Sequence, residues 1–137
     1  MNKKPRPIVV AMLMCDSVVQ DINTNKKSLQ GLFNRINLPE TPSRFRPFYV
    51  FLKLTEGNGA YDCELRCVNA NSLSPILRLQ GPLRFVDPNQ VLDISFEVPP
   101  ILFPSYGHYR FEFLCDGEPA ASSRFEVIQT LHRKEKV

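Results

Sequence analysis

Alternation of apolar and polar side chains is the feature that most constrains this chain. Residues 91–98 read VLDISFEV and residues 61–68 read YDCELRCV, so every second side chain is apolar over most of each segment. A period of two is that of a β-strand with one face in a core and the other in water. None of the candidate segments has the 3.6-residue period of an amphipathic helix, and the pattern therefore predicts an all-β protein.

Turn-forming residues divide the chain into short segments of this kind. Twelve prolines break regular pairing, and stretches such as DGEPA at residues 116–120 suit tight turns. The length of 137 residues suits one hydrophobic core. We expect a single antiparallel β-sandwich, immunoglobulin-like or jelly-roll-like, over residues 7–129. Its eight strands are expected at residues 7–15, 28–38, 48–55, 61–68, 76–85, 91–98, 108–116 and 122–128.

The first of these segments allows two interpretations. Residues 8–15 read IVVAMLMC and follow the basic stretch NKKPRP, an order that also begins an export signal. The apolar core of such a signal would span only Ile8–Met14, and Cys15 does not follow the small residues of a cleavage site. We therefore expect a central or well-covered strand, because it is apolar on both faces, in a cytoplasmic protein.

Basic residues concentrate at the two ends of the chain. Residues 1–6 and 132–137 hold six of the 17 Lys and Arg, which leaves residues 7–131 with 11 basic and 13 acidic side chains. We interpret residues 1–6 as a flexible basic arm and residues 130–137 as a basic C-terminal tail. Nucleic-acid-binding domains concentrate cations on the folded surface, so we do not expect a nucleic-acid partner.

The four cysteines are expected to be buried and reduced. Cys63 and Cys67 share one face of a strand but lie about 13 Å apart at roughly 3.3 Å per residue, beyond the roughly 7 Å between Cα atoms that a disulfide permits. The sequence has no CxxC motif, and neither histidine lies at metal-ligand spacing from a cysteine. A bridge between Cys15 and Cys115 is the alternative that the sequence leaves open.

We predict no catalytic, cofactor-binding or metal-binding residues, and we expect the protein not to be an enzyme. His108 begins a strand and is expected to point outward, on the face opposite Cys115, so the two cannot form a nucleophile–base pair. Asp16 and Asp116 each follow a cysteine at a strand end and are expected to cap turns. An enzyme would need these groups to converge in a buried cluster.

Short motifs occur in the first and last parts of the chain. They are Cys15-Asp16, the run SLQGLF at residues 28–33, Phe103-Pro104, Gly107, Tyr109, Phe111 and Asp116-Gly117. Together they resemble a family of small, uncharacterised bacterial proteins of about this length. The resemblance spans nearly the whole chain, although only alternation supports it in the middle. It implies an all-β, immunoglobulin-like protein that is bacterial and not secreted, and it implies no known activity.

The sequence favours a non-enzymatic binding or assembly module that mediates protein–protein contacts with a partner that the sequence does not identify. The contact would use a sheet edge, the Pro-rich loops at residues 39–47 and 99–106, or an exposed apolar sheet face, and a homodimer through an edge strand is one form of it. The alternative is a small-ligand or carbohydrate-binding domain. No apolar run approaches the ~20 residues of a membrane span. The candidate surface, opposite the expected core, consists of Leu32, Ile36, Tyr49, Phe51 and Leu114.

Overall fold

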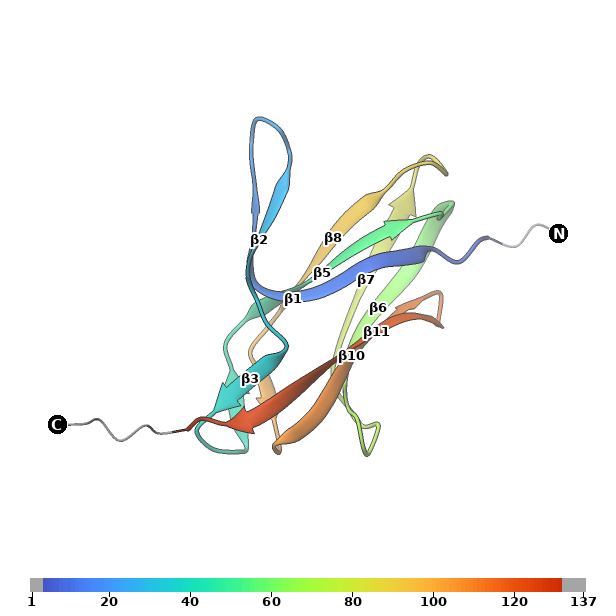
Figure 1. Ribbon diagram of the computed structural model, residues 1–137. Helices are drawn as coiled ribbons and strands as arrows, with labels where there is room; N and C mark the ends of the chain where they lie inside the picture. The colour runs from blue at the N-terminus through green and yellow to red at the C-terminus, as the bar shows by residue number, and fades with distance from the viewer. Residues whose placement is uncertain (1–3, 132–137) are drawn as a thin grey trace.

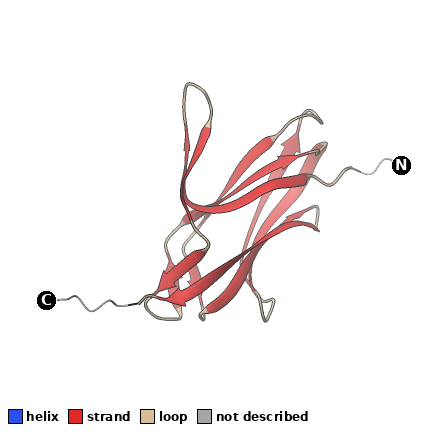
Figure 2. Ribbon diagram, viewed as in Figure 1, coloured by secondary structure: helices blue, strands red, loops and turns tan. Residues whose placement is uncertain are grey.

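A computed structural model describes residues 4–131, which form strands, turns and loops (Figures 1 and 2). The all-β prediction is confirmed, and none of the described residues belongs to a helix that could cross a membrane. These residues contain eleven strands rather than the eight that the sequence predicts. They are β1 (Ile8–Gln20), β2 (Lys27–Leu32), β3 (Arg35–Leu38), β4 (Ser43–Phe45), β5 (Phe48–Thr55), β6 (Gly59–Asn69), β7 (Pro75–Phe85), β8 (Leu92–Val98), β9 (Ile101–Phe103), β10 (Gly107–Cys115) and β11 (Glu118–Gln129).

The strands form three sheets. A four-stranded sheet has the order β2-β1-β5-β8, a five-stranded sheet has the order β3-β11-β10-β6-β7, and β4 pairs with β9. The pairing of β3 with β11 is parallel, whereas the other pairings are antiparallel. The prediction of a wholly antiparallel arrangement is therefore wrong at this one pair, because β3 enters its sheet beside the last strand of the chain.

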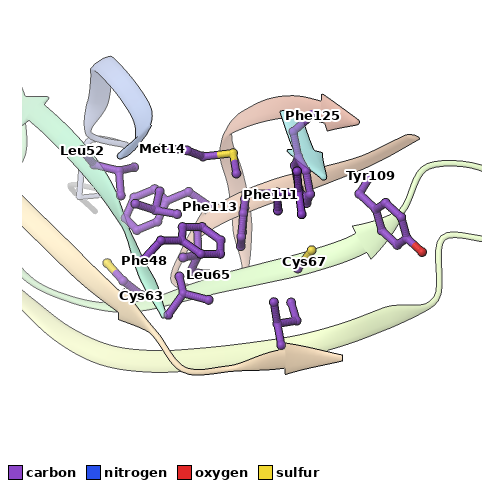
Figure 3. Close-up of a cluster of buried hydrophobic side chains, with 14 of the residues drawn as sticks. Met14, Phe48, Leu52, Cys63, Leu65, Cys67, Tyr109, Phe111, Phe113 and Phe125 are labelled. Carbon is purple, nitrogen blue, oxygen red and sulfur yellow. The ribbon is translucent and has the colours of Figure 1, made fainter. Parts of the chain in front are cut away.

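Aromatic side chains join the two larger sheets across a shared core. The ring centroids of Phe48 on β5 and Phe111 on β10 are 5.9 Å apart, and those of Phe96 on β8 and Phe113 on β10 are 6.1 Å apart. Figure 3 shows side chains from both sheets gathered in this core, Met14 of β1 among them. Full burial of one such side chain stabilises the fold by about 1.5–3 kcal/mol. The apolar positions of the alternating pattern thus fill the space between the sheets.

The predicted strand at residues 28–38 is two strands in different sheets. β2 ends at Leu32 and pairs with β1, whereas β3 begins at Arg35 and pairs with β11. Gly31 has a φ of +70°, and a Cβ at this position would lie 2.2 Å from Oδ2 of Asp16, so a larger residue would adopt a strained backbone and displace the Asp16 side chain. The remaining two extra strands, β4 and β9, lie in the Pro-rich segments that the sequence predicts as loops, and they pair with each other.

Two hairpins shape the ends of the molecule. β1 and β2 form a hairpin that stands out from the two layers (Figure 1). β10 and β11 are joined by Asp116 and Gly117, with φ values of +50° and +78°. Positive φ at both central residues is the geometry that an Asp-Gly turn favours between twisted strands. The turn predicted at DGEPA is therefore confirmed.

The described part of the basic arm is held against the domain. Lys4 and Arg6 form ion pairs with Asp116 and Glu118, with N–O distances of 2.8 and 3.4 Å. These contacts place the described part of the predicted arm beside the β10–β11 turn. The beginning of the arm and residues 132–137 of the predicted tail lie outside the described residues.

Candidate binding surface

The five apolar residues predicted as a contact surface do not form an exposed face. Leu32 is 60 % exposed and Tyr49 is half-buried. Ile36, Phe51 and Leu114 are buried, with exposed fractions of 1 %, 6 % and 5 %. The predicted surface is therefore wrong for three of its five members.

Each of the three is buried for its own reason. Ile36 belongs to the inter-sheet core, because the break between β2 and β3 moves the chain to the second sheet and resets its alternation. Phe51 lies outside that core cluster, so its cover comes from the outer side of the four-stranded sheet. Lys27 of the β1–β2 hairpin also donates a 2.8 Å hydrogen bond to the Asp93 carbonyl on β8, and this contact links the hairpin to the far strand of the same sheet. Leu114 also lies outside the core cluster, between Glu64 and residue 119 on the neighbouring strands.

Half of β1 lies at an open edge of its sheet. Residues Ile8–Cys15 pair with β5, but β2 pairs with β1 only from Cys15 to Gln20. On the side away from β5, Ile8–Met14 therefore have no strand neighbour among the described residues; we call this side the β1 edge. β11 of the other sheet approaches β1 without pairing with it. The expected central, well-covered strand is thus only partly central.

Backbone groups on the β1 edge are directed outward in the usual alternation. The Phe33 N–H donates to the Met14 carbonyl at 3.1 Å, from the side away from β5. Alternate residues of an antiparallel strand direct N–H and C=O to the same side, so Met12 also points its backbone groups to the β1 edge. An unpaired N–H and C=O on an extended strand is a template for another strand.

Apolar side chains are exposed along the same stretch. Ile8 is 55 % exposed and Val10 is 58 % exposed, and Leu13 and Leu32 are exposed beside them. A register shift between Val9 and Ala11 places Val10 in a β-bulge. Single exposed apolar residues are ordinary on a protein surface, but a continuous group of them marks a contact site.

A groove of about 400 Å³ borders the β1 edge. Its walls come from three separate parts of the chain, which are β1, the β2–β3 connection and β11. Five of its eight lining residues are apolar, and β11 contributes one cation. The lining residues are Met12, Leu13, Met14, Leu32, Phe33, Asn34, Ser123 and Arg124.

The outer face of the five-stranded sheet is polar. Arg66 pairs with Glu64, and Arg110 lies 3.1 Å from Glu112. The hydrogen bonds from Arg66 and then Gln80 lower the pKa of the Glu64 carboxyl. A groove of about 490 Å³ on this face has no aromatic residue in its lining, whereas sugar and small-ligand sites use aromatic walls. The face is therefore a network of exposed ion pairs, each worth at most about 1 kcal/mol.

The groups considered for catalysis each have a separate partner. Asp16 lies 2.8 Å from Arg46, Asp116 pairs with Lys4, and Nε2 of His108 lies 3.5 Å from the carboxylate of Glu126. These contacts do not bring the three groups into one cluster. Within the part of the chain that the structure describes, no group of three or more His, Cys, Asp and Glu has the arrangement of a metal site.

The cysteine predictions are partly confirmed. All four cysteines are buried and unpaired by disulfides, and Figure 3 shows Cys63 and Cys67 at separate points along β6. Cys15 lies outside the inter-sheet core cluster, opposite Leu32 and Tyr49 on its neighbouring strands, and burial raises the pKa of its thiol. Cys115 instead lies beside Cys63 across two paired strands. Sequence reasoning missed this pair, because strand order was needed to find it.

Comparison with known proteins places this all-β architecture in a family. A protein-family model described as a family of unknown function (DUF6941) matches residues 10–128. The chain belongs to this family, which agrees with the resemblance seen in its sequence.

A solved structure is also similar to the chain. It is described as an immunoglobulin-like protein from Pseudomonas aeruginosa, and it shares 11 % identity with a TM-score of 0.41 over 93 % of this chain and 100 % of the other. A likeness at this level carries no functional information about the chain. A search of curated protein sequences found no match to the chain.

Proposed function

We propose that the chain is a non-enzymatic assembly module whose partner is a second copy of itself, bound along the β1 edge. The observation that supports this most is the unpaired stretch Ile8–Leu13, which contains no charged residue and no proline. Natural proteins block free strand edges with charge, proline or a covering element. Between Ile8 and Leu13 the β1 edge has neither charge nor proline, and β11 approaches it without pairing.

The β1 edge is suited to pairing with its own copy. In a twofold dimer, β1 of one copy pairs antiparallel with β1 of the other copy. The N-terminal end of each strand then lies beside the C-terminal end of its partner. Because Ile8–Leu13 are uncharged, no like charges face each other in that pair. Lys4 and Arg6 precede the stretch and Asp16 follows it, but each already forms an ion pair within its own copy, so these charges neither favour nor oppose the contact.

The dimer should be weak. A pair of six-residue strands buries little surface, and contacts of less than about 1,200 Å² belong to transient complexes. The groove beside Met12 leaves room for side chains of the second copy. We therefore expect a dimer with a dissociation constant in the micromolar range, visible in a concentration series.

Substitution of Val10 by lysine tests this proposal. Val10 is 58 % exposed, so Val10→Lys leaves the monomer folded but brings an unpaired ammonium group into the contact. Burial of such a group makes the binding free energy less favourable by several kcal/mol. Each tenfold change in the dissociation constant corresponds to about 1.4 kcal/mol. We expect the variant to dimerise at least about 100-fold more weakly in sedimentation velocity. Gln80→Lys, which adds the same charge at an exposed position of β7, should dimerise like the unchanged chain.

Two results would contradict the proposal. A mass that stays at 15.7 kDa across the concentration series would exclude a self-association module. A dimer that Val10→Lys leaves intact would place the contact elsewhere and reject the β1 edge. Circular dichroism of both variants confirms that each is folded.

Two further predictions from the sequence belong with this proposal. An immunoglobulin-like sandwich is supported by the core that the two larger sheets share. A cytoplasmic location is supported by four buried cysteines without a disulfide, since disulfides mark oxidising compartments. A small-ligand or carbohydrate site is the less favoured alternative, because the groove on the polar face lacks aromatic walls.

A further inference from the structure

Cys63 and Cys115 occupy directly opposite positions on β6 and β10. Their Sγ atoms lie 3.7 Å apart, in contact but not bonded. The Asp116 N–H donates to the Asp62 carbonyl at 2.8 Å, one step beyond the cysteines. This hydrogen bond makes Cys63 and Cys115 a non-hydrogen-bonded pair, in which the Cα atoms are about 4.5 Å apart and the side chains are closest. That separation falls within the roughly 4.4–6.8 Å that disulfides span.

The N-terminal segment Lys4–Pro7 lies beside Cys115. It lines a groove of about 470 Å³ together with Tyr61, Cys115, Asp116 and Glu118. The Tyr61 hydroxyl donates to the Pro5 carbonyl, and the Lys4 ammonium lies 4.4 Å from the centre of the Tyr61 ring. These contacts add to the ion pairs of Lys4 and Arg6. Cys115 thus lies at the wall of a groove that a small oxidant can enter and that the segment partly covers.

The two thiols differ in their tendency to ionise. The hydrogen bond between them lowers the pKa of Cys115, and it raises the pKa of Cys63 together with burial. An oxidant in the groove beside Lys4–Pro7 meets Cys115, which lies in contact with Cys63, and either sulfur can donate the hydrogen bond between them. Cys67 has no such neighbour, and burial alone raises the pKa of its thiol. A reactive thiol beside a second one that can resolve it is the arrangement of redox-sensitive cysteines.

We propose that Cys63 and Cys115 form a reversible disulfide within one chain when the protein meets a peroxide. The Cys115 thiolate attacks one oxygen of hydrogen peroxide, the O–O bond breaks, and the departing hydroxide takes a proton to become water. The Cys63 sulfur then displaces hydroxide from the Cys115 sulfenic acid and gives up its proton, which forms the S–S bond and a second water. Two electrons pass from the thiols to the peroxide, and a dithiol reductant reverses the change. This site is independent of the β1 edge, because both cysteines belong to one copy.

Peptide mapping tests the disulfide directly. The native protein is treated with hydrogen peroxide, free thiols are then blocked in denaturant, and the chain is cut with trypsin. Cleavage after Lys and Arg places Cys63 alone in peptide 54–66 and Cys115 alone in peptide 111–124. We expect these two peptides to be joined, with Cys15 and Cys67 blocked as free thiols. Dithiothreitol should separate the joined peptides.

Variants establish which features matter. Cys63→Ala and Cys115→Ala should abolish the linked peptides, whereas Cys67→Ala should form them as the unchanged chain does. The double variant Lys4→Ala/Arg6→Ala removes both ion pairs of the covering segment, and it should form the disulfide several-fold faster. A rate equal to that of the unchanged chain would overturn the role of the segment.

Mapping of the unchanged chain decides the proposal even if a variant fails to fold. The proposal is overturned if all four cysteines remain free thiols under conditions in which the same peroxide treatment oxidises dithiothreitol. Linkage of any other pair, or Cys115 found as a sulfinic acid with Cys63 still free, would also overturn it. When the linked peptides are found in protein that has the mass of a monomer, the disulfide lies within one chain. This result holds whether the β1-edge dimer forms or not.

Discussion

The free edges of β1 and β7 differ in the features that control association between strands. β7 is the last strand of the five-stranded sheet, and it exposes Arg78 and Arg84 and contains Gly81-Pro82. Charge and proline at such positions prevent pairing with other molecules. The stretch Ile8–Leu13 of β1 has neither. The chain therefore protects one edge against association and leaves another open, and this contrast adds to the support for the proposed function in assembly.

Removal of the protection on β7 should have the largest effect. In the double variant Pro82→Val/Arg84→Val, each molecule would have two edges that accept another strand. Two different open edges allow head-to-tail growth without closure, so we expect a change from a small, defined species to large aggregates. Light scattering over time measures this. Arg84→Lys keeps the charge and serves as the control.

A double variant that remains as small as the unchanged chain would show that β7 needs no protection. The contrast between the two edges would then lose its meaning. A double variant that aggregates only after unfolding, seen as a lower melting temperature, would count against edge pairing in the same way.

The hairpin contact at Lys27 should have a moderate effect. Lys27→Met removes the hydrogen bond to the Asp93 carbonyl and with it this link between the β1–β2 hairpin and β8. Such a bond contributes about 1 kcal/mol, and we expect the free energy of unfolding to fall by about that amount. Hydrogen exchange should quicken at residues 16–32 while dimer formation stays unchanged. Lys26→Met, at the exposed neighbouring position, should have no effect, and equal loss from both variants would refute the contact.

Lowering the pH should have the smallest effect. It weakens the ion pair between Asp116 and Lys4, in the segment that precedes β1. The hydrogen bond from Lys4 lowers the pKa of Asp116 below its usual value of 3.8, so the folded state keeps this carboxylate charged to lower pH than the unfolded state does. The stability it contributes is present above pH 3.8 and is lost as the pH falls through the lowered pKa. Both groups are exposed, so the effect is small and is screened by salt.

Asp116→Asn isolates this contribution. Asn tolerates the positive φ of residue 116 and keeps an oxygen for the Asp62 N–H. The difference in unfolding free energy between the two chains should shrink as the pH falls below about 4, as measured by urea titration at several pH values. A difference that does not change with pH would reject the charge interaction.

Sequence reasoning succeeded where the signal was local. Each of the eight predicted segments contains strand, and the Asp116-Gly117 turn has the backbone that its two residues favour. It failed where a strand had to be assigned to a sheet. Ile36 was placed on an outer face, although the break after Leu32 moves it into the core of the other sheet.

The period of two and the turn residues by themselves determined that this protein is built of strands around one core. That is possible because alternation is a property of each strand's own pleat. Only the tertiary structure decided that Ile8–Met14 lies at an open edge, that Lys27 links the β1–β2 hairpin to β8, and that Cys63 meets Cys115. These features depend on which distant strands pair. Because strands pair through backbone hydrogen bonds, which nearly every residue type can form, the local sequence does not identify the partner strand. The apolar run at residues 8–15 indicated a buried strand, whereas the pairing made half of it a free edge.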